Sequence, residues 1–473
     1  MIRDGGLVSD GMEGVGMSLP QAQAEPADQQ GLQPPAGLPA IGHAGTAQVP
    51  AAGERAAYLA EVCRLLWPAP ARVSVSGAGG IAGGQPADSQ GGTDRDAAQP
   101  EPEARPAASE FIVLPGTRRP RLLVPAGRRA AAAAVRRYGE PGSLRTRLAT
   151  RGLSLLLGSG MGGAVLRDRL HVQAPAGAPT IESYLRATLG LDISVSMHLG
   201  AARANRKPVL QLLTAAGDTV GFAKIGVSPL TRDLVRAERD ALVRLGSTDV
   251  ASLAVPSVLH YGSWQDLTVI VLSPLPVWQR RVQLASGQLT LAMGEVAAVA
   301  GISRWPLAAS GYWRTLGERL AIADDTEDRR ALLKALEAVG QRAGDAVLCF
   351  GAWHGDWTPW NMASTRSGLL VWDWERFAIG VPLGFDALHH WLQAQVISGR
   401  RDPLVAAAGC VKRADALLAP LGVGTDEARL TALVYLADLA ARYLLDRQAE
   451  AGARLGAPSR WLIPALADGT AQL

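Results

Sequence analysis

The sequence predicts an α+β fold in which a β-rich segment precedes a larger helical segment. Three observations support this prediction. Short apolar runs with turn signals between them, which are typical of strands, lie at 192–200, 208–226 and 267–275. One stretch at 228–246 has the apolar spacing of an amphipathic helix. Beyond about residue 285 nearly every segment has helical spacing, and a chain of 473 residues has room for two or three domains.

Residues 1–108 are predicted to be mostly disordered. They are rich in Ala, Gly, Pro and Gln, and such a composition buries too little apolar surface to offset the entropy of ordering. The exception is one short helix near 53–67, where apolar residues recur at helical spacing.

Residues 109–180 are predicted to form a small accessory module rich in arginine. Two β-like runs at 110–126 meet at a Pro/Gly/Arg turn, and a helical stretch follows them. Between residues 110 and 170 there are twelve Arg and three acidic residues. Scattered arginines are usually solvated faces, and the alternative is a surface for an acidic protein partner or for phosphates. The sequence leaves both interpretations open.

The rest of the chain divides into a predicted β-rich N-lobe, 181–276, and a predicted helical C-lobe, 277–473. The apolar run "VLSPLPVW" at 271–278 breaks into prolines, which suits a hinge between the two lobes.

Composition excludes several other classes of protein. The net charge of +4 is small for this length, so general binding to nucleic acid is not expected. The longest apolar run, 153–166, is shorter than the about 20 residues that cross a bilayer, so no membrane partner is expected. Three well-separated cysteines and an N-terminus without an apolar core predict a cytoplasmic protein with reduced thiols. No pattern indicates the oligomeric state.

One constellation carries the chemistry. The stretch "WHGDWTPWNM", 353–362, places Asp356 and Asn361 five positions apart, and "LLVWDWE" brings Asp373 twelve positions later. The residues between predict a turn and a returning strand, so the three side chains meet at one cleft. Mg²⁺ prefers oxygen ligands and keeps several waters, so a carboxylate and an amide oxygen suffice beside substrate phosphates. The other carboxylate can then orient an attacking hydroxyl, as in kinase-type phosphoryl transfer.

An upstream lysine fits the same chemistry. Lys224 lies in the middle of an apolar strand, where a lysine without a partner is costly. Glu238 follows fourteen residues later, on the next predicted helix. A strand lysine held by a helix glutamate is an arrangement that binds nucleotide phosphates.

Together these motifs resemble the aminoglycoside phosphotransferase/choline kinase group of the protein-kinase-like superfamily, over about residues 181–450. The resemblance implies a two-lobed protein-kinase-like fold that binds Mg²⁺ and ATP in the cleft. It implies that Asp356 is the catalytic base and that Asn361 and Asp373 are the metal ligands.

The resemblance also assigns the supporting residues. Lys224 would hold the α- and β-phosphates, and Glu238 would hold Lys224. His354 would brace the catalytic loop by hydrogen bonding, and Asp386, in "GVPLGFDALHH", would be a structural residue at the start of a helix.

Two features depart from the pattern of the group. The expected glycine-rich phosphate loop reads "LGAARANRKPV", with Gly200 alone, so Arg203, Arg206 and Lys207 would supply charge to the phosphates instead. This leaves open whether the nucleotide is ATP or GTP. Thr358 stands two positions after Asp356, where Ser/Thr protein kinases usually carry a lysine, which favours a small-molecule substrate.

The sequence therefore predicts an ATP-dependent phosphotransferase. It would move the γ-phosphoryl group to a hydroxyl of an aminoglycoside-, amino alcohol- or sugar-like acceptor. The alternative is an inactive nucleotide-binding pseudokinase whose Arg-rich module, 110–170, holds a protein partner. His389 and His390 are interpreted as satisfied packing residues. The acidic run 323–330 is interpreted as a solvated helix start, with attraction of a cationic substrate as the other reading.

Overall fold

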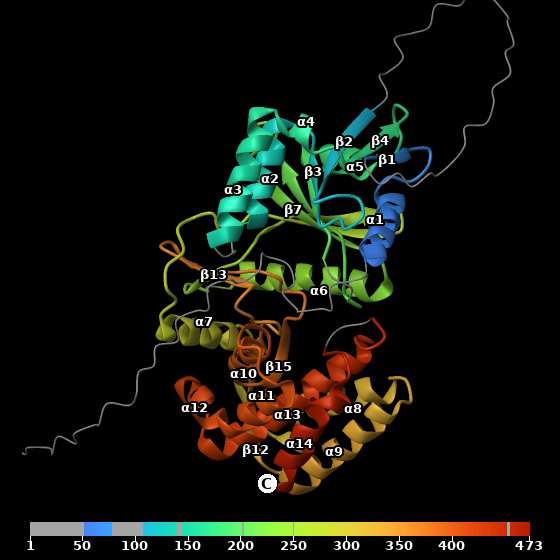
Figure 1. Ribbon diagram of the computed structural model, residues 1–473. Coiled ribbons are helices and arrows are strands. Elements are labelled where there is room, and N and C mark those ends of the chain that lie inside the picture. Colours follow the sequence, from blue (N-terminus) through green and yellow to red (C-terminus); the bar gives the residue numbers. More distant parts are fainter. Residues whose placement is uncertain (1–51, 78–106, 140–143, 201–202, 249, 452–454) are drawn as a thin grey trace, which may run out of the picture. The chain divides into compact units, whose positions relative to one another are not determined.

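The computed structural model describes residues 52–77, 107–139, 144–200, 203–248, 250–451 and 455–473 (Figure 1). The α+β prediction, with a β-rich N-lobe before a helical C-lobe, is confirmed in these residues. Most of the disorder predicted for 1–108 concerns residues outside the described ones. Within the described ones, the prediction is wrong for 72–76, which form the strand β1 and pair with β4, Arg169–Ala174. The predicted helix near 53–67 corresponds to α1, Ala52–Leu66.

One antiparallel sheet of nine strands organises the N-terminal half of the described residues. Its order is β1-β4-β2-β3-β5-β6-β7-β10-β9. The bounds are β1 Arg72–Ser76, β2 Ala107–Leu114, β3 Leu122–Pro125, β4 Arg169–Ala174, β5 Ser194–His198, β6 Val209–Leu213, β7 Thr219–Gly226, β9 Val258–Trp264 and β10 Leu267–Leu272.

The accessory module and the N-lobe share this sheet. Strand β3 pairs with β5 through Leu122 opposite His198 and Leu123 opposite Met197. The strands that the sequence analysis placed in a separate module, 109–180, therefore continue the sheet of the 181–276 lobe without an edge between them.

Side chains alternate between the two faces along every strand, so both faces of the sheet carry apolar residues. Helices cover each face. One face, with Leu123, Met197 and Ile225, packs against α1 and α5, Ile181–Leu189. There the indole nitrogen of Trp67 donates to buried Glu182 at 2.6 Å and ties the end of α1 to α5.

The opposite face carries two groups of helices side by side. Helices α2, Arg128–Gly139, and α3, Leu144–Ser159, pack on the apolar residues of β2 and β3, and the short α4, Gly162–Val165, follows α3. Helix α6, Pro229–Gly246, packs on β7 and β10. Ser228 caps α6 with a capping box and Pro229 begins it, which fixes where the helix leaves β7. The side chain of Lys224 lies on this second face.

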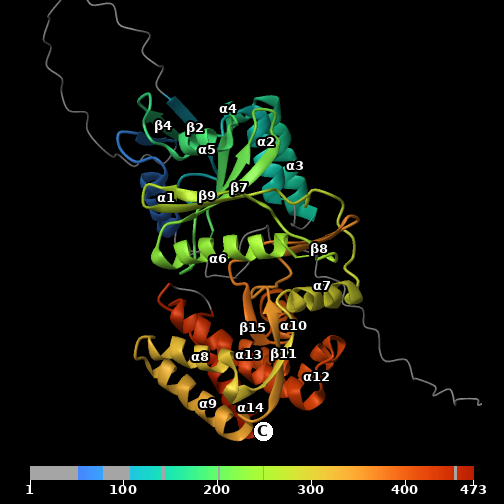
Figure 2. The same cartoon turned by 180° about the vertical axis from the view of Figure 1, so that it is seen from behind.

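The C-terminal half is mostly helical. Its helices are α7 Ser286–Ala298, α8 Gly311–Ala321, α9 Glu327–Ala343, α10 Phe385–Gln393, α11 Pro403–Lys412, α12 Ala414–Leu418, α13 Thr425–Leu445 and α14 Leu462–Ala471. Helix α13 is the centre of this half: it is buried almost all round and contacts α8, α9, α10, α11, α12 and α14 (Figure 2).

Two small sheets carry the loops of interest. One has the order β11-β12-β15, with β11 Ser303–Pro306, β12 Val347–Trp353 and β15 Ala378–Pro382. The other has the order β13-β14-β8, with β13 Met362–Thr365, β14 Gly368–Val371 and β8 Leu253–Ala254. The catalytic stretch joins β12 to β13, and the segment with Asp373 joins β14 to β15. Among the described residues no helix is long and apolar enough to span a bilayer.

Candidate active site

The loop after β12 is held in place by the start of α10. The backbone N–H groups of His354 and Gly355 donate to the two carboxylate oxygens of Asp386, at 2.7 and 3.1 Å. Burial raises the pKa of Asp386 to about 7, although these two hydrogen bonds act in the opposite direction. Asp386 thus lies where the sequence analysis placed it, in the first turn of a helix that supports the loop.

The imidazole of His354 holds the loop in place through two hydrogen bonds. Its Nε2 lies 3.1 Å from the carbonyl of Trp372, and its Nδ1 accepts the backbone N–H of Asp356 at 3.1 Å. Because Nδ1 accepts, Nε2 carries the proton and donates to the carbonyl. Burial lowers the pKa of His354 to about 4, so this neutral tautomer persists at neutral pH. The bonds are those of a residue that braces the loop.

Gly355 is required by close packing. Its φ is +83°, and a Cβ there would collide with the backbone carbonyl of Arg376. The Gly355 carbonyl in turn accepts a hydrogen bond from Arg442 of α13 at 2.7 Å. The glycine of "HGD" therefore lets the segment after Asp373 lie directly against the catalytic loop.

Asp356 is oriented on both carboxylate oxygens. His389 Nε2 lies 3.0 Å from Oδ1, and Asn361 Nδ2 donates to Oδ2 at 2.9 Å. The Asp356 side chain keeps 35% of its surface exposed, so the carboxylate is reachable from the cleft. Burial acts to raise the pKa of Asp356, but the hydrogen bond from His389 acts against it, and the pKa lies below its usual value. Asp356 is therefore an ionised, oriented and accessible carboxylate.

His389 has more than the packing role that the sequence analysis assigned to it. It is buried and touches Tyr435 of α13, whose hydroxyl lies 3.0 Å from His389 Nδ1. Burial raises the pKa of Tyr435, so its hydroxyl stays protonated and donates, and Nε2 of His389 then donates to Asp356. Burial lowers the pKa of His389, which keeps the ring neutral. One sequence signal was present: Asp386 and His389 stand three apart, on one face of a helix.

Lys224 and Glu238 form the predicted pair, and Asp373 joins it. Lys224 Nζ lies 2.6 Å from Glu238 Oε1 and 2.7 Å from Asp373 Oδ1. Burial works against the lysine charge, but the carboxylates of Asp373 and Glu238 raise the pKa of Lys224 above its usual value. Asp373 adopts a φ of +73°, a left-handed conformation that is uncommon outside glycine and that turns the chain between β14 and β15.

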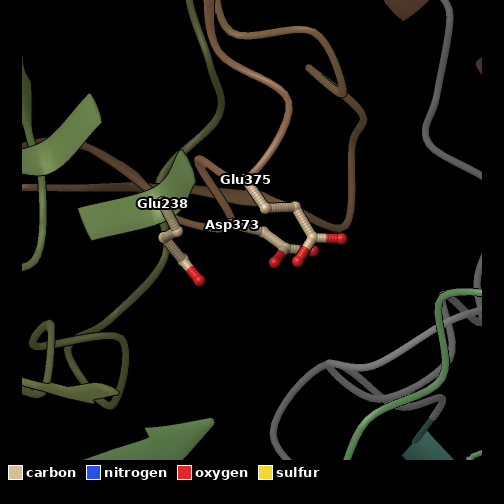
Figure 3. Close-up of side chains that lie close together, drawn as sticks. All are labelled: Glu238, Asp373 and Glu375. Carbon is tan, nitrogen blue, oxygen red and sulfur yellow. The ribbon is translucent and has the colours of Figure 1, made fainter. Parts of the chain in front are cut away.

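A third carboxylate, which the sequence analysis did not single out, completes this cluster. One carboxylate oxygen from each of Glu238, Asp373 and Glu375 lies within 4.8 Å of the others (Figure 3). Figure 3 shows the Asp373 and Glu375 carboxylates next to each other. Glu375 is buried and forms an ion pair with Lys207. The motif "VWDWE" contained it, two positions after Asp373.

The basic loop between β5 and β6 reaches the same centre. Lys207 does not extend into open space but pairs with Glu375. Burial lowers the pKa of Arg203, while the charges of Asp356, Tyr443 and Asp373 act to raise it. The guanidinium of Arg203 therefore lies close enough to these groups to interact with them. Arg206 instead stacks over the ring of Tyr58 in α1, 3.5 Å from the ring centre.

A cavity of about 160 Å³ lies beside Lys224. Six of the predicted site residues line it: Gly200, Arg206, Lys207, Lys224, Asn361 and Asp373. Helix α2 of the accessory module contributes Ala134 and Arg137 to the wall, and Phe222 of β7 lies under the Arg137 guanidinium at 5.4 Å. The module is therefore part of this pocket, which the sequence analysis did not anticipate.

The donor set fits a hard divalent cation. Asp373 and Glu375 offer carboxylate oxygens and Asn361 offers an amide oxygen. Oxygen is the ligand type that Mg²⁺ prefers. The Oε2 atom of Glu238 is buried and has no hydrogen-bond partner among the described residues, so the cluster holds more acceptor capacity than its lysines use. Nδ2 of Asn361 already donates to Asp356, which leaves the amide oxygen as the ligand atom.

Comparison with known proteins finds similar solved structures. A thermostable mutant of the aminoglycoside phosphotransferase APH(4)-Ia is 15% identical, with a TM-score of 0.41 over 62% of this chain and 98% of that chain. The GDP and kanamycin complex of APH(2″)-IIIa is 14% identical, with a TM-score of 0.39 over 61% and 98%. A protein of Haemophilus somnus assigned as a fructosamine-3-kinase is 13% identical, with a TM-score of 0.37 over 62% and 96%. No family model matches the chain, and no curated protein matches it.

Aminoglycoside phosphotransferases, the group that the motifs resemble, are thus among the structures to which the chain is similar. The α+β organisation that the sequence predicts, with a β-rich half before a helical half, is the organisation of this chain. The predicted lysine–glutamate pair lies between β7 and α6.

Proposed function

We propose that the protein is a small-molecule phosphotransferase that moves the γ-phosphoryl group of ATP to an acceptor hydroxyl. One observation carries the proposal: an oriented, ionised Asp356 lies in one centre with Asn361, Asp373 and a buried Lys224. Such a centre supplies what phosphoryl transfer needs, which is positioning and neutralisation of charge.

The proposed reaction runs through the side chains as follows. Asp356 accepts the hydrogen bond of the acceptor hydroxyl and aims its oxygen at the γ-phosphorus. A bond forms between that oxygen and phosphorus while the bond to the bridging oxygen of the β-phosphate breaks, and ADP leaves. The hydroxyl proton passes to the Asp356 carboxylate, which His389 and Asn361 hold in place on both oxygens.

Lys224 would hold the α- and β-phosphates, because its charge is fixed by Glu238 and its strand faces the cavity. A Mg²⁺ ion held by Asp373 and Asn361, with Glu375 beside them, would supply neutralisation of the phosphate charge. The basic loop with Arg203 would lie over the phosphates, in the role that a glycine-rich loop fills elsewhere.

The test is a screen of hydroxylated metabolites for acceptor-dependent ADP formation, with Asp356→Asn as the blank. At least one compound is expected to raise ADP formation in the wild-type protein and not in the variant. If no compound does so while the protein binds Mg-ATP, or if the blank responds equally, the proposal is wrong. Replacing ATP by GTP in the same screen decides the nucleotide.

A second candidate function, a protein-interaction scaffold, has one observation in its favour. Leu148 and Leu155 stand seven residues apart on α3 and are 65% and 75% exposed. Removing residues 110–170 would not test this function, because the strands of that segment belong to the common sheet and α2 lines the cavity beside Lys224. The double change Leu148→Gln and Leu155→Gln is the suitable test. Loss of a protein complex with unchanged ADP formation would support the scaffold.

A further inference from the structure

A second and larger cavity lies beside Trp353, the first residue of the stretch 353–362. It has a volume of about 550 Å³ and is formed by α8, the strands β11, β12 and β15, the segment 375–377 and α13. None of the nucleotide-side residues Lys207, Lys224 and Asn361 lines it. The two cavities are therefore separate.

This cavity adjoins the transfer centre. Its lining includes Glu375, whose carboxylate belongs to the cluster with Asp373. It also includes Arg442, which donates to the carbonyl of Gly355, the residue before Asp356. Arg376 lines it too, and its guanidinium lies in the field of Asp356. A molecule in this cavity has the catalytic loop as its neighbour.

The charged lining is predominantly basic. Arginines contribute four side chains and acids two, and the full set is Arg314, Arg319, Arg376, Arg442, Glu375 and Asp438. Both acids already have cationic partners, and three of the arginines are paired as well: Arg319 and Arg442 with Asp438, and Arg376 with Asp446. Asp438 lies 3.6 Å from Arg319 and 3.8 Å from Arg442, and Glu375 pairs with Lys207.

Donors also remain without acceptors here. Trp353 is only 5% exposed, and its buried indole Nε1 has no hydrogen-bond partner in the described part of the chain. An indole nitrogen can only donate, so it requires an acceptor atom. Arg314 is exposed at the cavity wall and forms no ion pair in the described part of the chain.

The acidic run that a cationic substrate would need lies elsewhere. Asp324 pairs with Arg447 at 2.6 Å, and Asp325 pairs with Arg330 at 2.9 Å, at the start of α9. No residue of 323–330 lines either cavity. The second reading of this run, attraction of a cationic substrate, therefore has no support from its position.

We propose that the 550 Å³ cavity binds the phosphoryl acceptor and that this acceptor carries an anionic group, a carboxylate or a phosphate, beside its hydroxyl. The inference rests on the proposed phosphotransferase function. It replaces the aminoglycoside- and amino alcohol-like acceptors of the sequence analysis by hydroxy acids or sugar phosphates. An ammonium group would find no free carboxylate in this lining, whereas an anion gains a charge-assisted hydrogen bond from Arg314.

The experiment has a binding arm and a turnover arm, with the full chain in both. Calorimetric titrations use D-gluconate and D-glycerate as carboxylates, 3-phosphoglycerate and glucose 6-phosphate as phosphates, glucose as a neutral sugar, and choline and kanamycin as cations. The same compounds are then tested for stimulation of ADP formation from Mg-ATP. Arg314→Gln is the test variant, and Arg330→Gln on α9, outside the cavity, is its matched control.

At least one anion is expected to bind, and the cations and glucose are not. The carboxylate and phosphate arms show which anionic group is preferred. Arg314→Gln is expected to weaken binding of the anion, and to raise its KM, by about tenfold with little change in kcat. Arg330→Gln is expected to leave both unchanged.

Binding of choline or kanamycin without any anion would overturn the inference, and so would binding of no anion in the calorimeter. An anion whose affinity is unchanged in Arg314→Gln would overturn the assignment to this cavity. Anion binding that depends on Arg314, without any ADP formation, would instead count against the phosphotransferase function. The two failures are therefore distinguishable.

Discussion

The two cavities, one beside Lys224 and one beside Trp353, differ in how their charges are balanced. On the nucleotide side, the buried lysines Lys224 and Lys207 are matched by the carboxylates of Glu238, Asp373 and Glu375. On the other side, arginines outnumber acids and the acids are already paired. The nucleotide side is thus an acidic cluster suited to a metal and its phosphates, and the acceptor side is a basic pocket.

In the proposed reaction one segment, 373–376, would serve both substrates. Asp373 lines the cavity beside Lys224, whereas Glu375 and Arg376 line the larger cavity, and the Glu375 carboxylate also joins the cluster with Asp373. Gly355 permits this segment to lie against the catalytic loop. The account therefore predicts that changes on the nucleotide side alter ATP binding, and that changes around Asp356 alter the rate.

The largest effect short of removing the base is expected for Lys224→Met. The change removes the cation that holds Glu238 and Asp373, and loss of one such charge contact typically costs about 10²–10³-fold in turnover. Mg-ATP affinity measured by calorimetry should fall as well. Lys334→Met, at an exposed position of α9, is the control and should leave both values unchanged. Wild-type ATP affinity in Lys224→Met would contradict the nucleotide-side assignment.

A second change breaks the contact that joins the two sides. Gly355→Ala introduces a Cβ against the Arg376 carbonyl at a positive φ and should lower the free energy of unfolding by about 2–4 kcal/mol. Denaturant unfolding measures it. Gly317→Ala in α8, where a Cβ meets open space, should instead be neutral or stabilising by about 0.5–1 kcal/mol. Equal stability of the two variants would show that the close approach is absent.

A smaller effect is expected for His389→Ala. Asp356 would lose one of its two orienting donors, so kcat should fall about tenfold while the affinity for Mg-ATP stays the same. His389→Gln, which can still donate, should recover part of the rate. His171→Gln on β4, away from this loop, is the control and should change kcat by less than about twofold. An equal loss in ATP affinity would indicate a purely structural role.

The smallest effect concerns pH. The pKa of Asp356 lies below its ordinary 3.8, and the pKa of neutral His354 lies at about 4. Both groups therefore keep their protonation state as pH falls from 8 to 5, and the acid limb of kcat should lie below about pH 4. A pH–rate profile with an inflection between about 6 and 7 would show that His354, His389 or Asp386, whose pKa lies at about 7, titrates during turnover.

The sequence was most informative where the determinants are local. Lys224, Glu238, Asp356, Asn361 and Asp373 could be singled out because a lysine within an apolar strand and polar residues at fixed spacing are unusual. The fully buried Trp357 and Trp374 pack with His354.

What could not be predicted depends on contacts between distant segments. The bond from Tyr435 to His389 requires α13 to lie against α10, and 46 residues separate the two side chains. Pairing of β3 with β5 places the accessory module in the common sheet, and no local pattern encodes that register. The arginines of the acceptor cavity come from α8, α13 and the segment after Asp373, so their excess is visible only in three dimensions.

The most direct test of the central claim compares Asp356→Asn with the wild-type protein in two measurements on the same samples. Mg-ATP affinity is measured by calorimetry, and phosphoryl transfer to the acceptor found in the screen is measured by ADP formation. Asn keeps the shape of the side chain and removes its negative charge. The account predicts ATP affinity within about threefold of wild type and a fall in kcat of about 10³-fold. Near-normal turnover in Asp356→Asn would contradict it.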